Sequence, residues 1–409
     1  MLSDDVVVVG AVSDDPLASD IAERMGQELD ISDILAFKDF ANSEFCPRFI
    51  LLQDDEHVGR SLEGKTAVIV SSCSGELTRN ARAMRNFLIT RAAKDNGAKR
   101  VVLVEPDLFY SAQDRGPKQD PNGKQRTFRD LKKFDGQPFS SRLYCELLKV
   151  AGVDAVMTIH NHSSAVAKMF SEKFGAENFF NLSPAKLYAC FLANEETLLD
   201  PDSERGIVVC APDNGCRPFV EEVYQYLKEY IDKKQMPLLP TPKRQVGMLW
   251  MDKERVGERS VNMICHENSP MKLEDIEGRE VIVFDDMVRT GTTIAECCRR
   301  LKAARARRVV FVVTHFYSSP EVKDNLNDSA IDAIITTNTL PNILNRDRQG
   351  RLRRKMLILK LERWIAHTLL KDVLGLEDKV NTCLYTVDVS RKNPHWEQLI
   401  RQADNQMMK

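Results

Sequence analysis

The chain has 409 residues, 43% of them hydrophobic and 29% charged, and a formal net charge of −2. This length favours two or three domains, and the composition is that of an ordinary globular protein. The near-neutral charge argues against nucleic acid or a membrane surface as the main partner, and no apolar run reaches the length of a membrane span. The acidic N-terminus, MLSDDVVVVG, passes directly into a strand-like run, unlike a signal peptide.

Strand-like and helix-like runs alternate over the first half. Apolar runs that predict strands cover residues 6–9, 66–72, 100–106 and 155–160. Helical patterns cover residues 16–29, 82–98 and 140–153. Ahead of the last helix, a polar segment rich in Pro, Gly and Lys, from about 114 to 138, predicts an extended surface loop.

The second half repeats this style. Strands are predicted at residues 206–213, 246–251, 280–286, 308–316, 333–338 and 356–362. Helices are predicted at residues 219–234, from about 294, and at 364–375, ahead of a polar tail. This alternation predicts an α/β fold with parallel sheets covered by helices on both faces.

Ten cysteines lie along the chain without the spacing of metal ligands or of a disulfide scaffold. Cys297 and Cys298 are adjacent, so they would point to different faces of a helix. We therefore expect reduced thiols in a cytoplasmic enzyme.

One stretch, residues 280–304, predicts a site for a phosphorylated sugar. The apolar run Val281–Phe284 is followed by the adjacent carboxylates Asp285 and Asp286, a turn of small residues and a helix from about Ile294. A helix N-terminus offers unpaired N–H groups to an anion, and the helix dipole favours negative charge there. The acidic pair suits the vicinal hydroxyls of a sugar or a hard cation such as magnesium. The alternative is a helix terminus capped by Asp and Thr for stability alone.

Two segments form a faint internal repeat. Residues 68–104 and 281–313 both run from VIV through a turn and a helix to RVV, and only the second copy has the acidic pair. Gene duplication would explain this, as would the general likeness of two Rossmann-like units.

The string DDMVRTGTT resembles the PRPP (phosphoribosyl diphosphate) loop of type I phosphoribosyltransferases and of PRPP synthetases. The order of the other motifs resembles the PRPP synthetase (ribose-phosphate diphosphokinase) family over most of residues 6–345. The strings that carry this resemblance are FANSE (40–44), FYSAQD (109–114), MTIHNHSS (157–164), APDNG (211–215), MDKER (251–255) and TTNTLP (336–341).

This resemblance implies two tandem phosphoribosyltransferase-type domains, at 1–181 and 182–375, with a tail at 376–409 of uncertain placement. The active site is expected between the domains, at the carboxyl ends of the strands. The implied reaction transfers the diphosphoryl group of ATP to the C1 hydroxyl of ribose 5-phosphate, giving PRPP and AMP. The resemblance also implies magnesium as cofactor and a homo-oligomer.

The same resemblance implies roles for single residues. Lys253 and Arg255 would provide positive charge to the transition state from a mobile loop. Ribose 5-phosphate would be bound by Asp285, Asp286, Arg289, Thr290, Gly291, Thr292 and Thr293. ATP would be bound by Phe40, Asn42, Glu44, Gln113 and Asp114. Magnesium would be contacted by His160 and Asp213.

Several of these residues have simpler interpretations. Phe40 could belong to the core, His160 could be a structural histidine, and Asp213 could serve only as a turn or N-cap residue. Lys253 and Arg255 could belong to a solvated charge run.

Three positions depart from the family pattern. Arg289 replaces a third acidic residue of the PRPP loop, and could either grip a phosphate or weaken ribose binding. Ala112 replaces an arginine, so that a triphosphate contact is missing or is supplied by Arg115. Thr158 replaces an aspartate, which should weaken magnesium binding. Two alternatives therefore stay open: a non-catalytic regulatory subunit, and a phosphoribosyltransferase that consumes PRPP.

Overall fold

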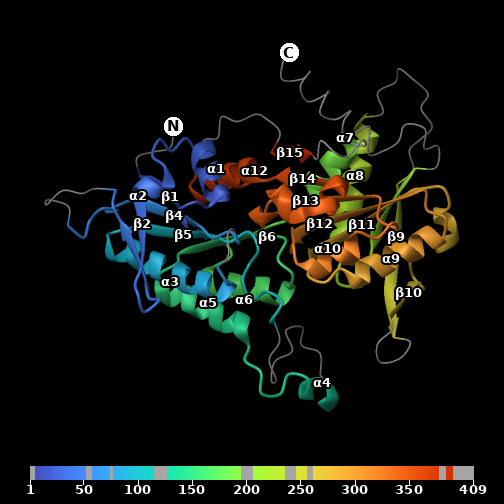
Figure 1. Ribbon diagram of the computed structural model, residues 1–409, viewed down its shortest axis with the longest axis horizontal. Helices are drawn as coiled ribbons and strands as arrows, with labels where there is room; N and C mark the ends of the chain where they lie inside the picture. Colours follow the sequence, from blue (N-terminus) through green and yellow to red (C-terminus); the bar gives the residue numbers. More distant parts are fainter. Residues whose placement is uncertain are drawn as a thin grey trace. The chain divides into compact units, whose positions relative to one another are not determined.

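A computed structural model describes residues 5–51, 58–73, 77–114, 127–194, 206–234, 246–255, 261–376 and 384–389. The chain forms two compact units (Figure 1). Unit 1 comprises Met1–Leu182, Thr339–Pro341 and Leu361–Leu384; unit 2 comprises Ser183–Asn338, Asn342–Lys360 and Tyr385–Lys409. None of the described helices is long and apolar enough to cross a membrane.

Unit 1 is built on a five-stranded parallel sheet with the order β1-β4-β5-β6-β7. Its strands are β1 (Val6–Gly10), β4 (Thr66–Val70), β5 (Arg100–Val104), β6 (Ala155–Ile159) and β7 (Phe179–Leu182). Because helices cover both faces, residues on both sides of the strands are apolar, and β1 and β6 are buried along their whole length. The four apolar runs of the first half are therefore strands, as predicted, while β7 was not foreseen.

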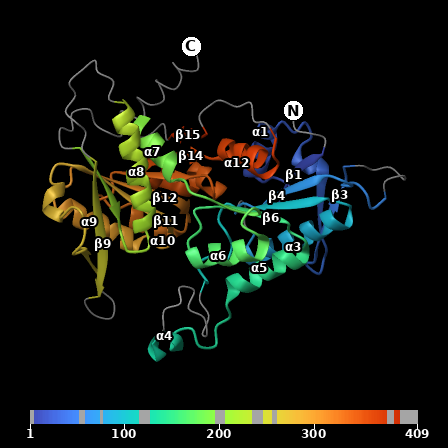
Figure 2. The same ribbon diagram turned by 180° about the vertical axis from the view of Figure 1, so that it is seen from behind.

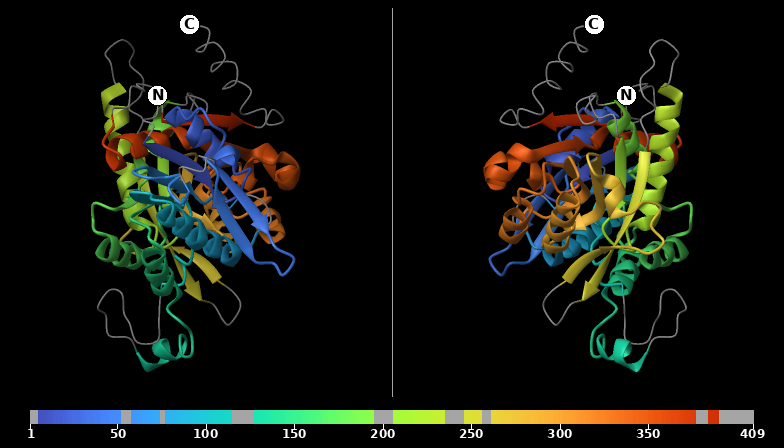
Figure 3. Two further views of the ribbon diagram at one scale, coloured as in Figure 1. Left: turned by 90° about the vertical axis from the view of Figure 1, so that its left-hand side faces the viewer. Right: turned by 90° about the vertical axis from the view of Figure 1, so that its right-hand side faces the viewer.

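Helices α3 (Arg79–Asp95), α5 (Ser140–Ala151) and α6 (Ser164–Phe174) lie on one side of this sheet. Helices α1 (Pro16–Met25) and α12 (Glu362–Thr368) lie on the other side, and the views in Figures 2 and 3 agree. The remaining elements are α2 (Ile31–Ile34), α4 (Phe128–Lys132), a π-helical turn at Leu369–Val373, and a hairpin of β2 (Leu35–Asp39) and β3 (Phe45–Phe49).

Two predictions for these segments need correction, and the division into units differs in part from the predicted domains. The helix predicted over 16–29 ends at Met25, because Gly26 takes a left-handed conformation (φ 85°) and caps it. The predicted loop at 114–138 contains α4, while residues 115–126 lie outside the described part. The predicted C-terminal domain, 182–375, differs from unit 2 because Leu361–Leu384 belongs to unit 1, where α12 packs on α1.

Unit 2 contains an eight-stranded sheet with the order β10-β9-β8-β11-β12-β13-β14-β15. The strands are β8 (Ile207–Ala211), β9 (Val246–Arg255), β10 (Val261–Cys265), β11 (Glu280–Val288), β12 (Arg308–Phe316), β13 (Ala333–Thr337), β14 (Met356–Lys360) and β15 (Thr386–Val389). The six central strands in this order, β9-β8-β11-β12-β13-β14, are parallel to one another. At the two edges of the sheet, β10 pairs antiparallel with β9, and β15 pairs antiparallel with β14. The predicted α/β class with two parallel, helix-covered sheets is confirmed.

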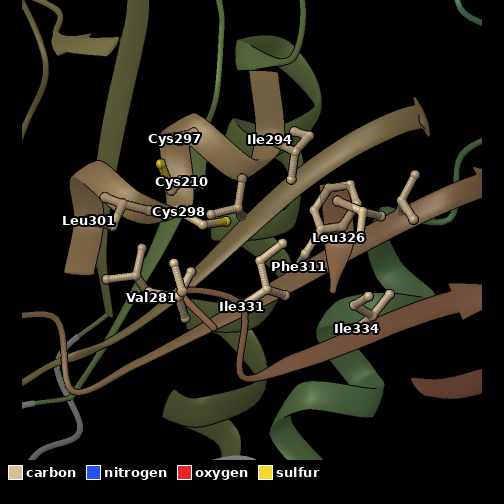
Figure 4. Packing of buried hydrophobic residues seen from close by; sticks show 14 of the residues in the cluster. Cys210, Val281, Ile294, Cys297, Cys298, Leu301, Phe311, Leu326, Ile331 and Ile334 are labelled. Atoms are coloured by element: carbon tan, nitrogen blue, oxygen red, sulfur yellow. The ribbon is translucent and has the colours of Figure 1, made fainter. Parts of the chain in front are cut away.

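Helices α7 (Ala185–Asn194) and α8 (Arg217–Lys234) lie together, and α9 (Thr292–Ala303) and α10 (Pro320–Leu326) lie together elsewhere on the sheet. Shorter helical elements are Leu273–Ile276, Pro341–Leu344, α11 (Arg346–Gln349) and Gly350–Lys355. Figure 4 shows how α9 packs: Ile294, Cys297 and Leu301 face the buried side chains of the strands below. Cys298 is also buried, so both adjacent cysteines lie in the core.

Candidate functional site

The strand order of unit 2 reverses at β8. The chain runs from β8 to its neighbour β9 on one side, and later inserts β11 on the other side. In open α/β sheets, ligands bind outside the carboxyl ends of the strands at such a switch point. The residues that follow β8 and those at the end of β11 therefore form the candidate site.

The acidic pair lies on β11 at this switch point. Pairing of β11 with β8 stops at Val283, whereas pairing with β12 continues through Asp285 to Val288. Strand β11 ends at Val288 rather than at the predicted residue 286, and both acids belong to it. Past the end of β8, the carboxylates therefore have a neighbouring strand on one side only.

Short hydrogen bonds hold the two carboxylates. Asp285 Oδ1 accepts from the backbone N–H of Asp286 at 2.9 Å and from the thiol of Cys216 at 3.1 Å, and Asp286 Oδ1 accepts from the N–H of Met287 at 2.8 Å. Burial, and then the charge and carboxyl group of Asp286, raise the pKa of Asp285 well above its ordinary range. Burial and the nearby Asp285 likewise raise the pKa of the Cys216 thiol, so it remains a hydrogen-bond donor.

The turn after β11 leaves the N-terminus of α9 without a side-chain cap. Gly291 is the N-cap residue, with φ 80°, and α9 begins at Thr292 rather than at the predicted Ile294. Asn325 of α10 steadies the turn, because its Nδ2 donates to Thr290 O at 2.8 Å and to Thr292 Oγ1 at 3.3 Å. Arg289, Thr290 and Thr292 are exposed and Thr293 is half-buried. A helix terminus with no side-chain cap, flanked by hydroxyls and a cation, is suited to an anion.

The corresponding turn of unit 1 is built differently. The β4–α3–β5 segment has the same parallel topology as β11–α9–β12. There, however, Thr78 caps α3 by accepting from the N–H of Ala81 at 3.2 Å. The two halves of the faint repeat therefore differ in how the N-terminus of the helix is capped.

Asp213 and Lys253 meet beside the acidic pair. Asp213 Oδ1 accepts from the N–H groups of Gly215 (3.0 Å) and Cys216 (3.3 Å), and Oδ2 accepts from Lys253 Nζ at 2.9 Å. Burial alone would raise the pKa of Asp213, but the hydrogen bond and charge of Lys253 together with Cys216 hold it below its ordinary value. Asp213 therefore stabilises its turn, as the simpler interpretation expected, and also pairs with the Lys253 ammonium group. Both side chains remain about a third exposed, at 34% and 39%.

The location of Lys253 corrects a prediction. Lys253 and Arg255 lie within strand β9, paired with Met263 and Val261 of β10, and not in a loop. Residues 256–260 and the side chain of Arg255 lie outside the described part. The polar sequence concealed the strand, because its order comes from antiparallel pairing and not from burial.

Sequence reasoning missed the cluster that supports this ribbon. Arg217 donates to Asp252 at 2.9 Å and lies over the Trp250 ring, 5.2 Å from its centroid. His266 Nε2 lies 3.6 Å from Asp252. These residues join β9 to the start of α8 and to β10. Only the alternation along β9 could have indicated that Asp252 and Lys253 point to opposite faces.

In unit 1, the FANSE segment forms the tip of the β2–β3 hairpin. Phe40 is 42% exposed, so it is not a core residue. Its N–H donates to Glu44 O at 2.8 Å, and Asn42 Oδ1 accepts from the N–H of Glu44 at 3.2 Å. Lys38 Nζ lies 4.7 Å from the centre of the Phe40 ring. An exposed aromatic ring held on a hairpin tip is available to stack on a planar ligand.

Gln113 and Asp114 lie beyond the carboxyl end of β5. The carbonyl of Gln113 accepts from Ser141 of α5, and Asp114 Oδ2 accepts from Ser163 Oγ at 2.7 Å, just ahead of α6. His160 follows β6 with φ 48°, a conformation uncommon for a non-glycine residue and often found at functional sites. Thr158 is fully buried and donates to Pro106 O at 3.3 Å, so its side chain is directed away from solvent.

A buried carboxyl group near this turn was also missed. Glu105 accepts from Tyr144 OH at 2.7 Å, Asn86 Nδ2 at 3.0 Å and the N–H of Phe109 at 2.8 Å. Burial raises the pKa of Glu105 to about 8, so it is largely protonated at neutral pH. The next acid, Asp107, pairs with Arg79 at the start of α3. A Glu directly after the apolar run RVVLV was the only signal in the sequence.

No preformed metal cage is present among the described residues: no three or more His, Cys, Asp or Glu side chains group to hold an ion. Magnesium does not need such a cage, because it is usually held by one or two carboxylates together with waters and substrate phosphates. The half-buried carboxyl groups of Asp213, Asp285 and Asp286 fit that kind of site.

Comparison with known proteins decides the family. A model of the N-terminal domain of ribose phosphate pyrophosphokinase matches residues 6–152, and a phosphoribosyl transferase domain model matches residues 192–343. The chain belongs to the PRPP synthetase family. It is a divergent member, 25% identical over 324 residues to a ribose-phosphate pyrophosphokinase of Corynebacterium efficiens, across 79% of this chain and 82% of that protein.

The fold agrees with this family. The crystal structure of phosphoribosylpyrophosphate synthetase from Mycobacterium smegmatis matches 91% of this chain and 99% of its own, with a TM-score of 0.66 and 23% identity. The type I phosphoribosyltransferase fold expected for a PRPP synthetase is therefore confirmed.

Proposed function

We propose that this member of the PRPP synthetase family is an active ribose-phosphate diphosphokinase that converts ATP and ribose 5-phosphate to PRPP and AMP. One observation carries the proposal. At the switch point of unit 2, an acidic pair, an uncapped helix terminus and the Asp213–Lys253 ion pair converge. These are the groups that a sugar phosphate and a developing negative charge require.

Unit 2 is proposed to bind ribose 5-phosphate. Asp285 and Asp286 accept hydrogen bonds from the ribose hydroxyls. The first turn of α9 donates N–H and hydroxyl groups to the 5-phosphate, with Gly291 allowing close approach and Thr290, Thr292 and Thr293 as hydroxyl donors. Arg289 is exposed beside this turn. We therefore assign it to the phosphate, which it can grip with two parallel hydrogen bonds.

Unit 1 is proposed to bind ATP. Phe40 stacks on the adenine, and Asn42 and Glu44 read its polar edge. Gln113 and Asp114 contact the nucleotide from the turn after β5. Ala112 lacks a cationic side chain, so the triphosphate contact expected there must come from another residue, and Arg115 lies outside the described part.

In the proposed reaction, the C1 hydroxyl oxygen of ribose 5-phosphate attacks the β-phosphorus of ATP. A new P–O bond forms, the bond from the β-phosphorus to the bridging oxygen of the α-phosphate breaks, and AMP leaves. The hydroxyl proton passes to solvent. Negative charge grows on the phosphoryl oxygens, and Lys253 and Arg255 stabilise it. Before the substrates bind, Lys253 forms an ion pair with Asp213.

Asp213 and His160 are the residues proposed to contact a magnesium ion bound together with ATP. When bound, the ion would neutralise charge on the phosphates. Because the buried Thr158 cannot serve as a ligand, we expect weaker magnesium binding than an aspartate at that position would give. We also propose a homo-oligomer, a cytoplasmic location and a domain boundary near residue 182.

The test is to incubate the purified protein with Mg-ATP and ribose 5-phosphate and to measure AMP and PRPP. Formation of both in equal amounts supports the proposal. Saturable ATP binding without turnover would favour a regulatory subunit, and consumption of PRPP with a nucleobase would favour a phosphoribosyltransferase.

A further inference from the structure

Cys216 lies at the centre of the unit 2 site, in the turn between β8 and α8. Its Sγ is 3.1 Å from Asp285 Oδ1, and its backbone N–H donates to Asp213 Oδ1 at 3.3 Å. One residue therefore contacts both carboxylates that flank the switch point, although Asp285 is 69 positions away in the chain. The side chain is partly buried.

The geometry at Asp285 shows what the thiol does. Two donors, the Cys216 S–H and the Asp286 N–H, reach the same oxygen, Oδ1. A carboxylate that receives two donors on one oxygen cannot rotate freely about its last side-chain bond. The thiol belongs to the turn ahead of α8, whereas the N–H belongs to strand β11, so two different elements hold this oxygen.

We propose that Cys216 is a positioning residue for sugar binding: its thiol orients Asp285 to receive a vicinal hydroxyl pair. This inference rests on the proposed function, since it assigns Asp285 to the ribose. Cys216 itself touches no reacting atom. Its backbone N–H also donates to Asp213, so Cys216 links the turn that holds Asp213 to the acidic pair.

The thiol is a weak donor, so the expected effect is moderate. A net hydrogen bond is worth about 1 kcal/mol, which corresponds to a change in affinity of roughly fivefold. Cys216→Ala should raise the Kd of ribose 5-phosphate about three- to tenfold. It should raise KM for this substrate similarly and leave kcat and KM for ATP within about twofold, because the chemistry and the nucleotide site are untouched.

A serine variant distinguishes two roles of the Cys216 side chain, hydrogen bonding to Asp285 and packing. Cys216→Ser keeps a donor of similar size and should restore ribose 5-phosphate affinity to within about twofold of the wild type. Should the alanine variant fail to fold, Cys216→Val makes the same comparison, since it fills the space without a donor. Cys190→Ala is the matched control, because Cys190 is another partly buried thiol of unit 2 that hydrogen bonds to Tyr230 of α8.

The experiment is calorimetric titration of each variant with ribose 5-phosphate, beside the kinetic measurements. Weaker binding in the alanine variant, rescue by serine and no change in the control support the inference. Equal affinity in Cys216→Ala and wild type, or loss without rescue by serine, overturns it while leaving the proposed function intact. If the wild-type protein does not bind ribose 5-phosphate, the proposed function fails and the inference fails with it.

Discussion

The turn at residues 289–293, proposed to bind the 5-phosphate, can be tested at Gly291 without changing a charged group. This residue has φ 80°, where a side chain costs about 1–2 kcal/mol. A Cβ here would also lie 3.2 Å from Leu326 and 3.4 Å from Asn325 Cβ. Either α10 or the turn must therefore shift by a few tenths of an ångström. Such a shift would disturb the two hydrogen bonds from Asn325 that steady the turn.

We expect Gly291→Ala to lose about 1–3 kcal/mol of stability and to weaken ribose 5-phosphate binding at least tenfold. The second figure follows from misaligning one charge-assisted N–H donor, which is worth about 1.5–3 kcal/mol. Gly350→Ala is the control, since Gly350 also has positive φ (54°) in unit 2 but its Cβ would meet nothing within 4 Å.

Thermal unfolding and calorimetric titration of both variants separate the two effects. The control should be destabilised and still bind ribose 5-phosphate with an affinity within about twofold of the wild type. If Gly291→Ala also binds normally despite its lower stability, the turn at the start of α9 does not hold the phosphate and the reasoning is refuted.

Three further predictions concern named carboxylates and one lysine. The double variant Asp285→Asn with Asp286→Asn should lose ribose 5-phosphate binding by about 100-fold or more and keep ATP binding, by calorimetry; unchanged binding of both ligands would mean the sugar is misassigned. Lys253→Ala should lower kcat about 100-fold with substrate affinity changed much less, whereas Lys302→Ala, which breaks the Lys302–Asp332 pair, should not lower it. Glu105→Gln tests the buried acid by denaturant unfolding at several pH values. Because the pKa of Glu105 is raised from 4.5 to about 8, the wild type should lose stability relative to the variant as pH rises through this interval, by up to roughly 5 kcal/mol, and the difference should level off above pH 8. A difference that does not vary with pH would show that Glu105 titrates normally.

Much of the fold was predictable because parallel strands that are buried on both faces have continuous apolar sequences. Runs such as TAVIV and EVIVF have few other interpretations in a chain that alternates with helices. The acidic pair and the small-residue turn were predictable for a related reason, since both follow such a run directly.

The missed elements depend on partners that are distant in the chain or on polar surfaces. The DKER segment is held as a strand by β10, whose own sequence gives little signal. Leu361–Leu384 joins unit 1 although it follows β14 of unit 2, because its packing partner, α1, lies near the N-terminus. The Cys216–Asp285 and Asp213–Lys253 contacts arise only when β8, β9 and β11 are neighbours, so neither can be seen in a local pattern.

The central claim is diphosphoryl transfer from ATP to the C1 hydroxyl of ribose 5-phosphate. Phosphorus NMR of the products formed from Mg-ATP and ribose 5-phosphate tests it most directly. We predict a diphosphate attached to C1 of ribose and AMP in equal amounts. ADP together with a ribose bisphosphate, or unchanged substrates after prolonged incubation, would contradict the claim.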